Sequence, residues 1–109
     1  MNKTYEVNWT EIAINDLSRI LEYLAIDDFM AAQKVYLRIK EKAKKLEILP
    51  FRGRVIPELK ELNIESYREI IENPWRIIYK VENNVVFVLS VIDGRRNVED
   101  ILLERFLSE

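Results

Sequence analysis

The 109-residue sequence contains neither cysteine nor histidine. The absence of cysteine excludes disulfides, thiol catalysis and thiolate ligands for a metal. The absence of histidine excludes Ser-His-Asp chemistry, histidine-bound zinc and the side chain that usually transfers protons near neutral pH. We therefore expect neither a metal ion nor another cofactor.

The sequence also lacks any long hydrophobic run. No apolar stretch approaches the roughly 20 residues that cross a membrane, and Met1–Tyr5 does not begin like a signal peptide. The formal net charge is −2, so no overall positive field attracts nucleic acid. We expect a cytoplasmic protein without a membrane partner.

What the sequence does contain is typical of one small globular domain. Hydrophobic residues make up 49% and charged residues 33%, which excludes wholesale disorder. A chain of this length can bury a single modest core, so residues 1–109 are interpreted as one domain. The cations are unevenly distributed, because seven of the nine arginines follow residue 50 and six of the eight lysines precede it.

The clearest pattern is a series of three predicted strands, Tyr67–Glu72, Trp75–Val81 and Val85–Ile92. They are rich in Val, Ile, Tyr, Phe and Trp, and short turn signals separate them. Gaps this short join antiparallel neighbours. We therefore expect an antiparallel meander whose alternate residues face opposite sides, with Trp75, Ile77, Tyr79 and Val81 on one side and Arg76, Ile78 and Lys80 on the other.

Helical patterns lie before and after the meander. Residues 4–9 alternate like a half-buried strand, and Thr10 is placed to cap a helix that extends to about Ala25. Asp27-Asp28 breaks the helical pattern and can cap a second helix, which we expect to continue until Pro50. Asn97 can cap a last helix over residues 98–107.

These elements predict an α+β fold: an N-terminal strand, an antiparallel helical hairpin packed on an antiparallel β-meander, and a short C-terminal helix. The sheet should be antiparallel with at least four strands, and Val35, Ile39 and Leu46 should be buried beneath the hairpin. The segment in between is ambiguous. We interpret residues 52–54 as a loop and residues 57–59 as a short extended piece or a turn.

Arginines outside the helices are the candidate functional residues. Arginine binds phosphate or carboxylate in a bidentate manner, so arginines that converge at one edge of the sheet would form a phosphate site or a site for an acidic partner. The alternative is structural, because Arg68 and Arg76 could pair with a glutamate of the meander, at position 69, 72 or 82. The candidates are Arg52, Arg54, Arg68, Arg76, Arg95 and Arg96.

Other polar groups are weighed in the same way. Asp93 is a candidate because it ends a strand directly before Gly94-Arg95-Arg96. The lysine-rich face of the second helix is interpreted as a solvated surface. The five tyrosines fall on apolar stripes or strand faces, which favours packing in the core over catalysis.

Five short segments occur in this order: Pro50-x-x-Gly53-Arg54, Pro57-Glu58-Leu59, Tyr67-Arg68-Glu69, Trp75-Arg76-Ile77-Ile78-Tyr79 and Val91-Ile92-Asp93-Gly94-Arg95-Arg96. Together they resemble the RelE/ParE superfamily of type II toxin–antitoxin toxins, which includes plasmid stabilisation proteins. The resemblance covers nearly the whole chain. It implies a RelE/ParE-like fold, growth inhibition and a co-expressed antitoxin that wraps around the toxin.

The resemblance implies one of two activities. RelE-like toxins cut mRNA in the ribosomal A site, where residues matching Arg68, Arg76 and the Arg95-Arg96 pair would stabilise the charge on the phosphate. ParE-like toxins poison DNA gyrase. The sequence departs from the nucleases at Asp93, where many relatives have histidine, at Ile70, which is basic in some, and in residues 98–109, which lack a tyrosine found in some. No general base is evident.

The leading hypothesis is a ParE-like toxin that binds a macromolecular target, DNA gyrase, and is neutralised by a cognate antitoxin. The alternative is a RelE-like ribosome-dependent mRNA endoribonuclease, or mRNA interferase, that uses the arginine cluster. A third possibility is a non-toxic member that only binds its antitoxin. We expect a short, acidic antitoxin whose helix lies against the hairpin and whose tail approaches Arg76 and Arg95. Its apolar contacts would include Phe29, Ile48, Leu49, Phe51, Leu103 and Phe106.

Overall fold

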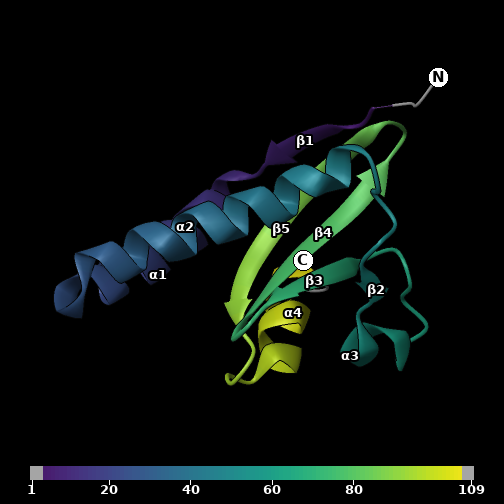
Figure 1. Cartoon of the computed structure of the whole chain (residues 1–109). Coiled ribbons are helices and arrows are strands. Elements are labelled where there is room, and N and C mark those ends of the chain that lie inside the picture. The colour runs from purple at the N-terminus through teal and green to yellow at the C-terminus, as the bar shows by residue number, and fades with distance from the viewer. Residues whose placement is uncertain (1–3, 107–109) are drawn as a thin grey trace.

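A computed structural model of the protein describes residues 4–106. Five strands form one sheet, with the helical hairpin on one face and the two short helices on the other (Figure 1). The predicted α+β class is confirmed. In chain order the elements are β1 (Glu6–Trp9), α1 (Glu11–Asp27), α2 (Phe29–Lys44), the 3₁₀ turn η1 (Lys45–Glu47), β2 (Arg54–Val55), α3 (Pro57–Lys60), β3 (Arg68–Glu72), β4 (Trp75–Glu82), β5 (Val85–Asp93) and α4 (Val98–Phe106).

The strands lie in the order β1-β5-β4-β3-β2. β3 to β5 are antiparallel neighbours, as predicted, with Ile70 of β3 opposite Ile77 of β4. The expectation of a loop over residues 52–54 is wrong at Arg54, which begins β2 and pairs antiparallel with β3. The expectation of a wholly antiparallel sheet is wrong at its first strand, because β1 runs parallel to β5 with Glu6 opposite Val85. Parallel neighbours need a long connection, and the helices and strands between them provide it.

The hairpin of α1 and α2 is defined by its caps. The Thr10 side chain accepts a hydrogen bond from the Ala13 N–H at the start of α1, and Asp28 accepts one from the Ala31 N–H at the start of α2. The cap at Thr10 was predicted, and Asp28 is one of the two residues, Asp27 and Asp28, that were predicted to cap the second helix. Asp28 also ends α1, since its N–H bonds to the Leu24 carbonyl. One residue therefore separates the two helices and turns the chain back on itself.

The sheet separates two apolar clusters. Under the hairpin, Ile39 and Leu46 are fully buried against Ile77 and Tyr79, although Val35, also expected in the core, is only partly buried. On the opposite face, α3 and α4 cover a smaller cluster that includes Ile78 and Leu102. The side-chain alternation predicted for β4 is confirmed by these two clusters.

Two helical segments before the meander differ from the prediction. α2 ends at Lys44 rather than near Pro50, and the chain tightens into η1 before the proline. Residues 57–60 form the short helix α3, with Pro57 in its first turn, where the missing N–H costs nothing. Residue 107 of the predicted last helix lies outside the described residues. Within residues 4–106, no helix is both long and apolar enough to span a membrane.

Candidate functional site

The loop that carries the Gly53 motif is fixed against β4. The Gly53 N–H donates to the hydroxyl of buried Tyr79 at 2.9 Å. A Cβ atom at position 53 would lie 2.6 Å from both the Glu69 carbonyl oxygen and the Tyr79 hydroxyl, so only glycine fits. Burial raises the pKa of the Tyr79 hydroxyl above its usual value. Tyr79 therefore supports this loop as a neutral phenol.

Arg68 holds the same loop from β3. Its Nη1 donates to the Gly53 carbonyl at 2.8 Å, and its guanidinium lies 5.4 Å from the centre of the Phe51 ring. Within residues 4–106 it makes no ion pair with a carboxylate. Arg68 is thus a cation bonded to a carbonyl and an aromatic ring.

A network of alternating charges, built around one buried carboxylate, crosses the other face of the sheet. The side chain of Glu69 is fully buried and accepts from Arg54 Nε and Arg76 Nε, each at 2.6 Å. Arg76 also donates through Nη1 and Nη2 to the two oxygens of Glu58, at 2.8 and 2.7 Å. The structural role considered for Arg76, an ion pair with Glu69, is therefore present. Its second partner, Glu58, was not predicted from the sequence.

The network leaves little of Arg76 available to a ligand. Its side chain is 11% exposed, and three of its nitrogens bond to carboxylates. These bonds, the one to Glu58 first, raise the pKa of Arg76, and the same bond lowers the pKa of Glu58. The formal charges of two arginines and two glutamates cancel.

Arg95 is paired in a similar way, but at the surface. Its Nε and Nη2 donate to the two oxygens of Asp93 at 3.0 and 2.7 Å, and its N–H also donates to Asp93. These hydrogen bonds lower the pKa of Asp93 to about 2. A carboxyl group with so low a pKa is a weak general base at neutral pH.

The candidate arginines do not form one cluster. Arg68 is opposite Tyr79 on the hairpin face, whereas Arg76 is opposite Ile92 on the α3–α4 face. Arg54, Arg76 and Arg95 line a hollow of about 560 Å³ beside the β3–β4 turn. Arg52 shares a neighbouring hollow of about 250 Å³ with Lys42 and Arg54. Arg52 and Arg96 are exposed and have no carboxylate partner among the described residues.

A further ion pair, which was not predicted from the sequence, attaches α4 to α1. Arg105 donates to both oxygens of Asp16 in α1, at 2.7 and 3.0 Å, and to the Ser90 hydroxyl at 2.9 Å. Asp16 also accepts from the Val91 N–H, on the part of β5 that β1 does not cover. Asp16 lies on the buried side of α1, next to Leu17. A carboxylate on the apolar side of a predicted helix is the signal in the sequence that could have indicated a buried ion pair.

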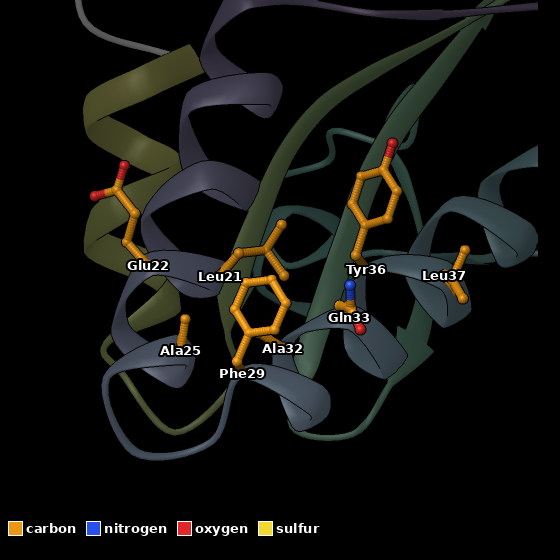
Figure 2. A pocket seen from close by; sticks show the side chains of 8 residues that line it. All are labelled: Leu21, Glu22, Ala25, Phe29, Ala32, Gln33, Tyr36 and Leu37. Atoms are coloured by element: carbon orange, nitrogen blue, oxygen red, sulfur yellow. The ribbon is translucent and has the colours of Figure 1, made fainter.

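A separate apolar surface lies on the hairpin. A hollow of about 530 Å³ is lined by Leu21 of α1 and by Phe29 and Tyr36 of α2, among others. Figure 2 shows the side chains that line it. Tyr23 and Tyr36, expected in the core, are 76% and 41% exposed. Of the apolar residues expected to contact an antitoxin, Leu103 and Phe106 are partly buried and the other four are more than half exposed, namely Phe29, Ile48, Leu49 and Phe51.

The two helices of the hairpin carry opposite charge. α1 contains four carboxylates and one arginine, whereas α2 contains five cations and one carboxylate. Of the α2 cations, only Lys42 forms an ion pair among the described residues, with Glu72 at 3.4 Å. The α2 side of the hairpin is therefore a cationic surface bordering an apolar hollow.

Comparison with known proteins decides the family. Residues 7–98 match the model of the ParE toxin of type II toxin–antitoxin systems. The chain belongs to this ParE toxin family. The RelE/ParE resemblance of the sequence is thereby confirmed, and the protein is a toxin of a type II toxin–antitoxin system, a family that implies a cognate antitoxin.

This ParE-family toxin is similar to one curated protein and to one solved structure. Toxin RelE2 of Caulobacter vibrioides is 32% identical over 92 residues, which span 84% of this chain and 97% of that protein. A solved structure of a chromosomal ParDE system from P. aeruginosa matches with a TM-score of 0.70 and 20% identity, covering 84% of the toxin and 97% of that chain. The structural likeness shows the shared fold.

Proposed function

We propose that this ParE-family toxin stops growth in the cytoplasm by binding DNA gyrase, and that it breaks no bond itself. The observation that carries the proposal is the engagement of Arg76, the central candidate arginine, by Glu58 and Glu69. A nuclease of the RelE kind would need free cations at the phosphate and a group that accepts a proton.

Three cations around the β3–β4 turn are already engaged, whereas Arg68 and Arg96 have no carboxylate partner among the described residues. Arg54, Arg76 and Arg95 each already bond a carboxylate within the described residues. Asp93, with its pKa near 2, is a weak base, and the sequence has no histidine. The relative named Toxin RelE2 points by its name to the alternative, a ribosome-dependent endoribonuclease.

Brief expression in bacteria separates these targets. We expect gyrase trapped on cleaved DNA, and we expect the purified toxin to inhibit supercoiling by gyrase in vitro. Mapping of mRNA ends in the same cells should show no new cuts at ribosomal A sites. New mRNA cuts without gyrase trapped on cleaved DNA would overturn the proposal and show that the toxin is a ribosome-dependent nuclease. Unimpaired growth would support a member that only binds its antitoxin.

We further propose that the antitoxin neutralises the toxin by seating an amphipathic helix on the hairpin hollow of Figure 2. The hollow is apolar, and Phe29 beside it is 65% exposed. Four of the five α2 cations form no ion pair among the described residues, and they favour an acidic partner. A segment of this kind can fold on binding and cover a wide surface.

A matched pair of variants tests the docking site. Phe29 lines the hollow and Met30, its neighbour in the first turn of α2, does not, yet the two are 65% and 62% exposed. We expect Phe29→Glu to keep toxicity and to lose neutralisation by the co-expressed antitoxin. Met30→Glu should be neutralised normally. Equal neutralisation of both variants would place the antitoxin elsewhere.

A further inference from the structure

The loop between η1 and β2 exposes three large apolar side chains to solvent. Ile48, Leu49 and Phe51 are 64%, 58% and 57% exposed. Pro50 between them is buried, and so is Gly53 after them. The loop is therefore attached to the rest of the protein through Pro50 and Gly53, while its large side chains face outward. We call residues 48–51 the apolar loop.

The backbone of the apolar loop is held by hydrogen bonds on both sides of Pro50. The Leu49 N–H donates to the Lys45 carbonyl at 3.1 Å, and the Arg52 N–H donates to the Leu49 carbonyl at 3.2 Å. Gly53 is fixed by the two hydrogen bonds described above. A surface that is already ordered loses little conformational freedom when it binds, so a partner meets the loop in one shape.

Cations without a carboxylate partner border the apolar loop. Arg52 directly follows it and is exposed, and the Arg68 guanidinium lies 5.4 Å from the centre of the Phe51 ring. Neither arginine forms an ion pair among the described residues. Lys45 and Glu47, which precede the loop, offset each other in formal charge. The border is therefore positive overall and favours a partner with carboxylates at the same place.

The apolar loop is separate from the hairpin hollow. On α2 that hollow extends from Phe29 to Leu37, and no residue of the apolar loop lines it. The chain enters the loop beyond the end of α2 that is opposite the α1–α2 turn (Figure 1). The 16 residues of α2 span roughly 24 Å, which places the loop far from Phe29. The antitoxin helix proposed above therefore does not account for these three side chains, although the sequence analysis assigned them to the antitoxin.

We propose that the apolar loop is the surface through which the toxin contacts its target, and that it enters an apolar recess bordered by carboxylates on that protein. The inference rests on the proposed function, in which the target is DNA gyrase. Large apolar side chains that cluster at a surface and have a polar border are typical of protein–protein contacts. The aliphatic side chains of Ile48 and Leu49 favour a protein over a nucleic acid, because phosphates bind cations and bases stack on aromatic rings.

Inhibition of DNA supercoiling by gyrase, measured with the purified full-length toxin, tests the proposal. We expect Leu49→Glu to raise the concentration for half-maximal inhibition at least tenfold, because it places a carboxylate in the apolar recess. Ile26→Glu is the matched control and should inhibit like the unmodified toxin. Ile26 is 80% exposed near the end of α1, and it lies neither in the apolar loop nor in the lining of the hairpin hollow. Both variants should co-purify with the antitoxin encoded beside the toxin.

A charge reversal tests the acidic border of the recess. We expect Arg52→Glu to weaken inhibition at least fivefold, and we expect this difference to shrink as the salt concentration rises, because salt screens charges at a surface. Arg19→Glu, at an exposed arginine of α1, is the control and should leave inhibition unchanged. Equal inhibition by the two variants would contradict a carboxylate beside Arg52.

The outcomes separate this proposal from the proposed function. If the unmodified toxin inhibits gyrase and Leu49→Glu inhibits equally well, the apolar loop is not the target surface and the proposed function stands. Loss of antitoxin binding by Leu49→Glu, with full inhibition of gyrase, would assign the loop to the antitoxin instead. If the unmodified toxin does not inhibit gyrase, both proposals fail, and mRNA cuts that Leu49→Glu abolishes would identify the ribosome as the partner of the loop. Urea unfolding shows whether Leu49→Glu is folded; if it is not, Ile48→Glu replaces it in every assay.

Discussion

The buried carboxylate of Glu69 gives the sharpest test of the charge network. Its side chain is fully buried and accepts hydrogen bonds from Arg54 and Arg76 at 2.6 Å. Glu69→Gln keeps the size of the side chain but removes its charge and replaces one acceptor by a donor. One arginine then loses its partner and faces an amide N–H group instead.

The expected loss follows from the burial of the pair. A hydrogen bond to a charged group contributes about 1.5–3 kcal/mol, and removal of one partner of a buried ion pair costs about 3–5 kcal/mol. We expect Glu69→Gln to lower the free energy of unfolding by roughly 3 kcal/mol. With a urea m-value of about 1–3 kcal/mol/M, the midpoint of unfolding should fall by about 1–3 M.

Circular dichroism in a urea titration at pH 7 measures this change. The control is Glu82→Gln, which breaks the Lys80–Glu82 pair at the surface, where Glu82 is 54% exposed. Such a pair contributes about 0–1 kcal/mol. If Glu69→Gln loses no more stability than Glu82→Gln, the network does not stabilise the fold, and Arg54 and Arg76 become available as ligand-binding groups again.

Three further predictions concern the loop, the strand end and the core. Gly53→Ala should destabilise the toxin by roughly 1–3 kcal/mol, because the new Cβ meets a backbone oxygen that cannot rotate away; a loss below 0.5 kcal/mol in urea unfolding would show that the loop moves freely. Carboxyl ¹³C titration should give Asp93 a pKa of about 2, and Arg95→Ala should return it towards 3.8. Since the folded pKa is the lower one, the stabilisation by this pair is complete above about pH 4 and disappears as the pH falls towards 2; a pKa near 3.8 in the unmodified toxin would contradict the pairing. Ile39→Ala should cost roughly 2–5 kcal/mol through the cavity it creates under the hairpin, and a thermal unfolding experiment that shows less than 1 kcal/mol would remove Ile39 from the core.

The sequence by itself determined the first strand, the helical hairpin, the three-stranded meander and the last helix, and their order along the chain. Thr10 and Asp28 are capping residues that act on their own neighbours, and the alternation along β4 follows from the strand geometry alone. Local chemistry of this kind can be read without knowing which segments meet. The five motifs likewise indicated the toxin superfamily, which the family comparison confirmed.

Tertiary structure decided which charges meet. Glu58 precedes Arg76 by 18 residues and Asp16 precedes Arg105 by 89, and each pair forms only because the fold brings two distant elements together. Strand spacing placed Arg68 and Arg76 inside strands but did not reveal that they face opposite sides of the finished sheet, because that depends on register across the turn. The parallel pairing of β1 with β5 has the same cause, because it depends on the path of the whole intervening chain.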